Sequence, residues 1–184
     1  MSKKTVPTVC LVVDTSVARS AGPPATNDAR GQACRDFLIA MRGAGHRLAF
    51  SPAIQAEWLK HMSGFSTLWL ASMVSLRKVQ LVAVDAHEEF REAVDEHSPN
   101  DGVKRAVIKD AHLVETAMAS DKRVASLDDT VRGHLARLTT HCKLIKPLLW
   151  VNPDQEDEQV IAWLSSGAPN ELKRQLGRYR PESA

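Results

Sequence analysis

Val9–Val17, with the sequence VCLVVDTSV, is the stretch on which the predicted fold depends. It is a short apolar run, rich in valine, that ends at the acid Asp14 and at two small hydroxyl residues, Thr15 and Ser16. An apolar run of this length and composition predicts a buried β-strand. In an open α/β sheet the ligand site lies beyond the carboxyl ends of the strands, and Asp14 follows such an end. Asp14 is therefore either a helix cap or part of an active site.

The chain as a whole has the size and composition of one domain with a terminal extension. It contains 184 residues, of which 43% are hydrophobic, and its net charge is +2. This charge excludes a protein that coats nucleic acid through its total charge, although local basic patches are compatible with it. Three cysteines without metal-ligand spacing indicate reduced thiols in a cytoplasmic protein. No apolar run approaches the ~18 residues of a membrane span, and no signal peptide is expected.

Predicted strands alternate with predicted helices along the chain. We expect strands at residues 9–13, 46–50, 79–84, 123–127 and 148–151. Helices are expected at residues 29–42, 52–61, 65–77, 85–96, 103–119, 130–138 and 154–164, with a loop over 18–28 and a basic, weakly helical stretch over 171–180. This alternation favours an α/β fold with a parallel, doubly wound sheet.

Four acids stand where a parallel sheet would bring them together. Asp14 follows the first strand, Asp128 follows the fourth, Glu57 lies in the helix after the second, and Asp110 lies in the helix before the fourth. Clustered carboxylates repel one another unless a cation compensates them. Oxygen ligands without thiols or paired histidines select Mg²⁺ or Mn²⁺, ions that activate water and stabilise in-line phosphoryl displacement. The pattern therefore indicates phosphodiester hydrolysis.

Each acid also has an ordinary structural interpretation. Asp14 and Asp128 precede helices and are residues of the kind that caps a helix start. Glu57 fits a solvated helix position, as most glutamates do. Asp110 is expected on the apolar side of its helix, where aspartate is unfavourable and a buried acid needs a partner. The order of the four acids, rather than any one of them, favours a site.

The motifs around these acids resemble those of the PIN-domain nucleases. The matching stretches are VVDTSV around Asp14, SPAIQAEW around Glu57, KDAHLVETA around Asp110 and VASLDD around Asp128. LLWVNP, at residues 148–153, is similar to the last strand of that family.

The resemblance covers residues 8–153, between an N-terminal tail of residues 1–7 and a C-terminal helical extension over 154–184. It implies a three-layer α/β/α sandwich around a mostly parallel five-stranded sheet. It also implies a metal-dependent carboxylate site and ribonuclease activity.

By position, the resemblance assigns Asp14, Asp110 and Asp128 as ligands of Mg²⁺ or Mn²⁺, with Glu57 completing the catalytic set. It gives Ser16 the role of orienting Asp14 or a water held by the metal.

One corner of the expected site departs from the family pattern. The family often has a threonine where Ser126 stands, and a second acid two residues past the position of Asp128. That second position is Thr130 in this chain, and Asp129 lies between. Three alternatives stay open: Asp129 substitutes for the acid, Thr130 holds a water of the metal, or a second metal binds weakly.

Basic residues close to these acids in sequence are candidates for substrate contact. They are Lys60 and His61 near Glu57, Lys109 beside Asp110, and Arg132 past Asp128. Phosphate contacts of this kind position a nucleic acid, although most such charges are simply solvated. His112 is expected to face elsewhere on its helix and to be a surface residue.

Our main hypothesis from the sequence is a cytoplasmic, Mg²⁺- or Mn²⁺-dependent endoribonuclease of the PIN type. RNA is the expected partner, no membrane is involved, and the family suggests a homodimer. A toxin with an antitoxin or other protein partner, an RNA-processing nuclease and a defence nuclease are all compatible with the resemblance. The alternative is a catalytically degraded PIN-fold module that binds RNA or a protein.

Overall fold

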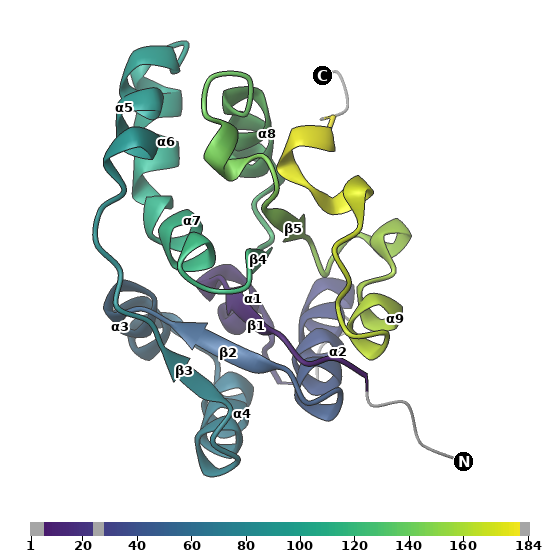
Figure 1. Ribbon diagram of the computed structural model, residues 1–184. Helices are drawn as coiled ribbons and strands as arrows, with labels where there is room; N and C mark the ends of the chain where they lie inside the picture. The colour runs from purple at the N-terminus through teal and green to yellow at the C-terminus, as the bar shows by residue number, and fades with distance from the viewer. Residues whose placement is uncertain (1–5, 24–27, 181–184) are drawn as a thin grey trace.

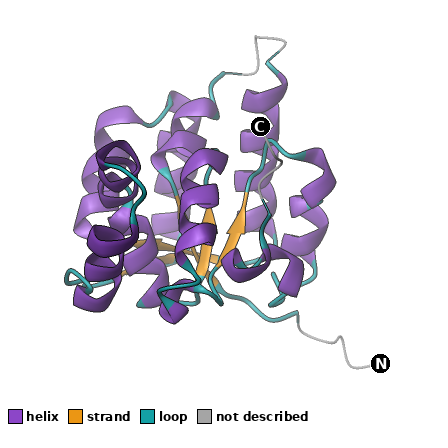
Figure 2. Ribbon diagram, turned by 90° about the horizontal axis from the view of Figure 1, so that it is seen from above, coloured by secondary structure: helices purple, strands orange, loops and turns teal. Residues whose placement is uncertain are grey.

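The computed structural model describes residues 6–23 and 28–180. Most of the predicted N-terminal tail, residues 24–27 of the predicted loop and the last four residues lie outside the described ranges. The described part is an α/β fold whose helices cover both faces of a central sheet (Figure 1, Figure 2).

The sheet has five strands, all parallel, in the order β3-β2-β1-β4-β5. The strands are β1 (Cys10–Val13), β2 (Arg47–Phe50), β3 (Val79–Leu81), β4 (Arg123–Ala125) and β5 (Leu149–Val151). The predicted α/β sandwich with a parallel five-stranded sheet is confirmed. The third and fourth strands are shorter than expected because the chain leaves the ladder after Leu81 and after Ala125.

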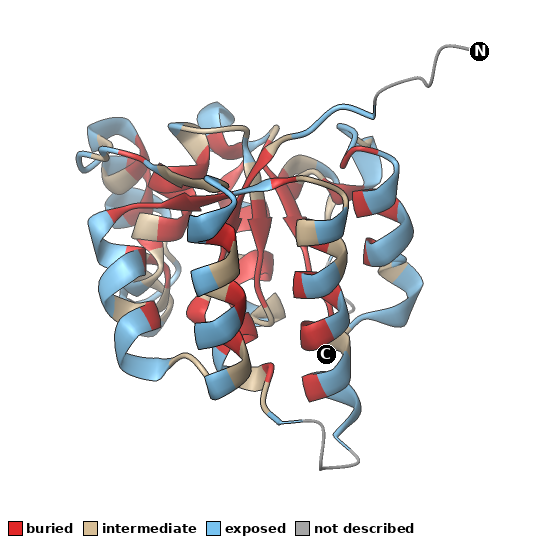
Figure 3. Cartoon of the chain, turned by 90° about the horizontal axis from the view of Figure 1, so that it is seen from below, coloured by how far each residue is buried: buried red, intermediate tan, exposed pale blue. Residues whose placement is uncertain are grey.

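β1 is the central strand, and its sequence CLVV explains its place. All four residues are at most 1% exposed, and the continuous apolar run suits a parallel strand covered on both faces. Figure 3 shows the strands as a buried layer between helices whose outer faces are exposed. Successive crossovers go from β1 to β2 and β3 on one side, and then to β4 and β5 on the other. The switch point therefore lies between β1 and β4, where α/β sheets bind ligands.

The helices are α1 (Thr15–Ser20), α2 (Ala29–Gly43), α3 (Pro52–His61), α4 (Gly64–Ser75), α5 (Glu88–His97), α6 (Asp101–Lys109), α7 (Ala111–Met118), α8 (Asp129–Leu138) and α9 (Val160–Ser165). α7 packs against β1, β2 and β4, whereas α1 and α2 pack together and α9 lies along α2. Within the described residues, no helix has both the length and the apolar character needed to cross a membrane.

Three segments differ from the sequence prediction. α1 occupies the start of a region expected to be a loop, and the single helix expected over residues 103–119 is divided at Asp110. The helix expected to begin at residue 154 begins only at Val160, after the 3-10 turn η2 (Glu156–Glu158) and a left-handed Gln159.

The C-terminal segment packs on the sandwich through two further 3-10 turns. These are η3 (Leu172–Arg174), which lies beside β5, and η4 (Leu176–Arg178), which lies on α8. Gln175 forms an antiparallel bridge with Leu149, and Leu176 is fully buried. Residues 171–180, expected to be weakly helical, therefore form a short packed segment, called the strap below.

Candidate active site

A cleft of about 460 Å³ lies at the switch point between β1 and β4. It collects all four acids that the sequence singles out, although they come from four separate segments. The cleft is lined by Asp14, Thr15, Ser16, Arg19, Ala56, Glu57, Lys60, His61, Lys109, Asp110 and Asp128.

Asp14 occupies the N-cap position of α1, but its carboxylate makes no capping hydrogen bond. Instead its Oδ2 accepts from the Ser16 hydroxyl at 2.5 Å and from the Ser126 hydroxyl at 2.7 Å. The backbone N–H of Asp14 donates to Ala125 at 2.9 Å, which ties the ends of β1 and β4 together. Ser16 contacts Asp14 as the sequence predicted, and Ser126 is a second hydroxyl that fixes the same oxygen.

Asp128 combines both roles that the sequence left open. Its Oδ1 accepts from the Val131 backbone N–H at 2.8 Å, so it caps α8. Its own N–H donates to the Ser126 hydroxyl at 3.1 Å, so Asp128 and Asp14 are held by the same serine. Because only one side-chain oxygen is used by the cap, the other retains its capacity to accept.

Asp110 does not lie inside a helix, as the sequence suggested, but at the junction of two. It ends α6 and precedes α7, with φ −100° and ψ 9°. Buried apolar residues continue through the junction, from Val107 in α6 to Ala111, Leu113 and Val114 in α7, so periodicity alone cannot locate the break. Aspartate favours helix ends over interiors, and this preference was the available signal.

Burial raises the pKa of Asp110 from 3.8 to about 6. Lys109, 3.9 Å away and exposed, lowers that pKa, whereas Asp14 and Asp128 raise it. The charges of Asp14 and Asp128 therefore act on Asp110 across the cleft. In the described part of the chain, no lysine, arginine or histidine forms an ion pair with Asp14 or Asp128.

Glu57 reaches the cleft because α3 is fixed at its start and on its inner face. The Ser51 hydroxyl accepts from the Ile54 N–H at 3.4 Å and caps the helix. The indole of Trp58, fully buried, donates to the Val13 carbonyl at 2.9 Å and anchors α3 to the end of β1. The residue before Trp58 is thereby turned toward the cleft.

His112 is a residue of this region that the sequence placed elsewhere. Its Nε2 lies 3.4 Å from Glu57 Oε2, and its Nδ1 lies 3.1 Å from the Lys109 carbonyl oxygen. The Thr15 hydroxyl lies 3.4 Å from the same Glu57 oxygen. The expectation of a surface histidine is wrong, since only 15% of its side chain is exposed. Because Asp110 is not helical, the direction of His112 does not follow from helical spacing.

The predicted substrate contacts have different outcomes. Lys60 and Lys109 line the cleft, whereas Arg132 does not. Arg132 is 3% exposed, its guanidinium lies 2.5 Å from Glu158 and 4.0 Å above the ring of Tyr179, and it is therefore placed for packing rather than for substrate contact. Arg19 was not predicted to line the cleft, because its segment was expected to be a loop.

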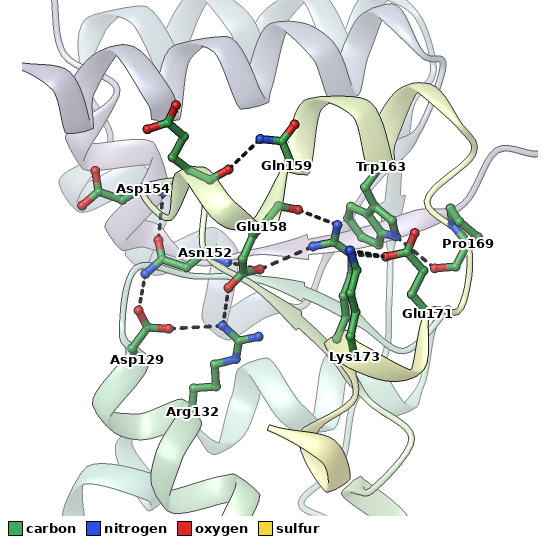
Figure 4. Close-up of polar contacts among 12 residues, drawn as sticks. Asp129, Arg132, Asn152, Asp154, Glu158, Gln159, Trp163, Pro169, Glu171 and Lys173 are labelled. Atoms are coloured by element: carbon green, nitrogen blue, oxygen red, sulfur yellow. Dashed lines mark hydrogen bonds and ion pairs between the residues drawn. The ribbon is translucent and has the colours of Figure 1, made fainter. Parts of the chain in front are cut away.

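The altered corner of the family pattern is turned away from the cleft. Asp129 accepts from the Asn152 amide at 2.6 Å and lies 3.4 Å from Arg132, as Figure 4 shows. Asp129 and Thr130 line a neighbouring pocket beside Glu158 rather than the cleft of Asp14. Asp129 is therefore engaged by hydrogen bonds outside the cleft of Asp14.

The carboxylate and hydroxyl oxygens of the cleft are ligands of the kind that a hard divalent cation prefers. As the side chains stand in the described residues, no three His, Cys, Asp or Glu are close enough together to hold a metal ion. Clustered carboxylates repel one another unless a cation compensates them. Burial is the main cause of the raised pKa of Asp110, and Asp14 and Asp128 add to it. Asp14, Asp110 and Asp128 are the residues that fit such an ion.

Comparisons with models of known protein families, with curated proteins and with solved structures find no match to this chain.

Proposed function

We propose that this protein is a divalent-metal-dependent endoribonuclease whose site is the cleft of Asp14, Glu57, Asp110 and Asp128. The observation that carries the proposal is the convergence of these four acids at the switch point between β1 and β4. They lie as far apart as residues 14 and 128 in the sequence, and among the described residues Asp14 and Asp128 have no cationic partner. Concentrating negative charge in this way costs free energy, which a functional site commonly tolerates.

The side chains of the cleft suggest distinct contributions. Asp14, held on one oxygen by two serines, and Asp128, held by its cap, are fixed ligands for Mg²⁺ or Mn²⁺, with Asp110 as the third. When bound, such an ion supplies an activated water and positive charge for the phosphate oxygens. Glu57 faces the same space and is the candidate to orient the attacking water or accept its proton.

Lys60 and Lys109 contribute to substrate binding in this proposal. Each is exposed and lines the cleft, so each is able to contact a phosphate of the RNA backbone, although Lys109 also lies 3.9 Å from Asp110. Such contacts orient the strand but carry no sequence information.

The direct test is cleavage of an internally labelled single-stranded RNA with Mg²⁺ or Mn²⁺, compared with a chelator. Asp14→Asn keeps the shape of the side chain and its acceptor for Ser16 and Ser126 but removes the charge. We expect cleavage to fall to background in this variant and in the chelator, with the thermal unfolding of the variant unchanged or raised. Glu92→Gln, at an exposed position of α5, is the matched control and should cleave like the original protein. Undiminished cleavage by Asp14→Asn would refute the proposal.

One observation favours a second candidate, a non-catalytic module that binds RNA or a protein through the same fold. The corner at Asp129 and Thr130 lacks the expected acid, and Asp129 is engaged elsewhere. Titration with Mn²⁺ separates the two candidates. Binding that is lost in Asp110→Asn supports the enzyme, and the absence of any binding supports the module.

A further inference from the structure

The cleft has a row of acidic residues and, beside it, a row of basic residues, called the acidic row and the basic row below. Both rows lie on two helices that pack together. α1 carries Asp14 at its start and Arg19 in its last turn. α3 carries Glu57 and, in its last turn, Lys60 and His61. α1 and α3 contact each other, and all five residues line the same cleft.

Hydrogen bonds between the two helices show that they run in the same direction. Near the start of α1, the Thr15 hydroxyl lies 3.4 Å from Glu57 of α3. Just after the end of α3, the Ser63 N–H donates to the Ala18 carbonyl at 3.2 Å, and the Ser63 hydroxyl donates to the Ala21 carbonyl at 2.5 Å. The acidic positions therefore lie together, and so do the last turns that carry the basic residues.

The spacing of the two rows follows from helix geometry. With a rise of about 1.5 Å per residue, Arg19 lies about 7.5 Å beyond Asp14 along α1, and Lys60 and His61 lie about 5–6 Å beyond Glu57 along α3. The basic row is therefore roughly one helical turn from the acidic row on both helices. A ligand with two adjacent anionic groups would match this arrangement, one group near the acids through a cation and the other at the basic row.

The cations of the basic row are available to such a ligand. Arg19, Lys60 and His61 are exposed, and no carboxylate in the described part of the chain forms an ion pair with any of them. Cations in the last turn of a helix are also favoured by the helix dipole, so they remain there without a carboxylate partner.

We propose that Arg19 and Lys60, together with His61, form a subsite for the phosphate that neighbours the cleaved one. The inference rests on the proposed function, because it takes a phosphodiester at the acidic row as its starting point. It adds the substrate class: a strand with at least two consecutive phosphates, rather than an isolated phosphodiester.

Two substrates test the subsite. An RNA oligonucleotide has neighbouring phosphates, whereas bis(p-nitrophenyl) phosphate has a single phosphodiester and none beside it. We expect Arg19→Ala and Lys60→Ala each to lower kcat/KM on RNA about tenfold more than on the small ester, the size of a lost charge-assisted hydrogen bond. Arg47→Ala is the control, since Arg47 is an exposed arginine at the amino end of β2, opposite the cleft.

A second measurement uses RNA binding by Asp14→Asn protein at several salt concentrations. Loss of one phosphate contact should reduce the slope of log affinity against log salt by about 0.7 for a single strand. Equal losses on both substrates, or an unchanged salt slope, would overturn the subsite while leaving the proposed function intact. If the original protein cleaves neither substrate, the proposed function fails and the subsite fails with it.

Discussion

Asp128 and Asp129 are neighbours in sequence, and they enter opposite environments. Asp128 turns into the cleft, where its charge acts on Asp110, and no cation in residues 6–23 or 28–180 forms an ion pair with it. Asp129 turns into a network of Asn152, Arg132 and Glu158, in which carboxylates and guanidinium groups neutralise one another (Figure 4). The difference shows what distinguishes a candidate ligand from a structural acid here. The fold supplies a counter-charge to Asp129, whereas no cation in the described part of the chain pairs with Asp128.

Around Glu158, in contrast to the cleft, carboxylates are paired with guanidinium groups. Glu158 lies 2.5 Å from Arg132 and 3.5 Å from Arg174, and both arginines are 3% exposed. Arg174 also donates to the Glu158 carbonyl and to Glu171, so the strap after α9 is fastened to α8 by charge as well as by packing.

The largest expected effect comes from breaking this network. Glu158→Gln leaves two buried guanidinium groups with less counter-charge, and removing one partner of a buried pair costs about 3–5 kcal/mol. Burial raises the pKa of Glu158, and this shift works against the loss. The expected loss rests on the two buried guanidinium groups left without their partner, and we place it at the low end, about 3 kcal/mol. Urea unfolding measures the change, with the exposed Glu156→Gln as its control. An unchanged free energy of unfolding would mean that the network is not compensated as described.

In the cleft, removing a carboxylate should raise the free energy of unfolding rather than lower it. Burial and the neighbouring acids raise the pKa of Asp110 from 3.8 to about 6. A carboxyl with a raised pKa stabilises the fold fully below about pH 4, and this contribution is lost as the pH rises through about 6. Without divalent ions, Asp110→Asn should therefore gain about 1–3 kcal/mol relative to the original protein between about pH 4 and about pH 7.5.

Urea unfolding in a chelator at both pH values measures this gain. Glu92→Gln, an exposed change of the same kind, should show no comparable difference between the two pH values. If Asp110→Asn is less stable than the original protein at the higher pH, its carboxylate is stabilised by the cleft and the comparison fails.

A smaller effect is expected from replacing Ser126, the serine that contacts both Asp14 and Asp128. Ser126 donates to Asp14 and accepts from the backbone of Asp128. Loss of a group that orients a ligand commonly lowers metal affinity 10–100-fold, and because Ser16 remains we expect about tenfold for Ser126→Ala. Calorimetric titration with Mn²⁺ measures it, and Ser165→Ala, on the exposed side of α9, should bind like the original protein. Equal affinities of the two variants would show that Ser126 does not orient the site.

The sequence predicted the sheet and the acidic row because both depend on local signals. Each buried strand is a short apolar run, and each strand-end acid follows it directly, so parallel topology was enough to bring Asp14 and Asp128 together. Glu57 depended most on the resemblance, since nothing local distinguishes it from a solvated helix residue, whereas Asp110 was marked by its place on an apolar helix side. The division of the helix at Asp110 was hidden by apolar periodicity that continues across it.

The ion pairs around Glu158 could not be predicted in the same way. Arg132 reaches Glu158 over 26 residues and shares it with Arg174, so its partners are set by the folding of the C-terminal strap. Basic charge near Asp128 in sequence therefore suggested a substrate contact that the structure does not provide. Arg19 was missed for the converse reason, because α1 is only six residues long and ends close to a proline-rich stretch.

Mn²⁺ binding to Asp128→Asn and Asp129→Asn tests most directly whether the cleft is a cation site. Asparagine caps a helix about as well as aspartate, so Asp128→Asn should keep the start of α8 while removing the charge. We predict that the original protein and Asp129→Asn bind Mn²⁺ alike in calorimetric titration, whereas Asp128→Asn binds at least about tenfold more weakly. Equal binding by Asp128→Asn and the original protein, or no binding by the original protein, would contradict the account.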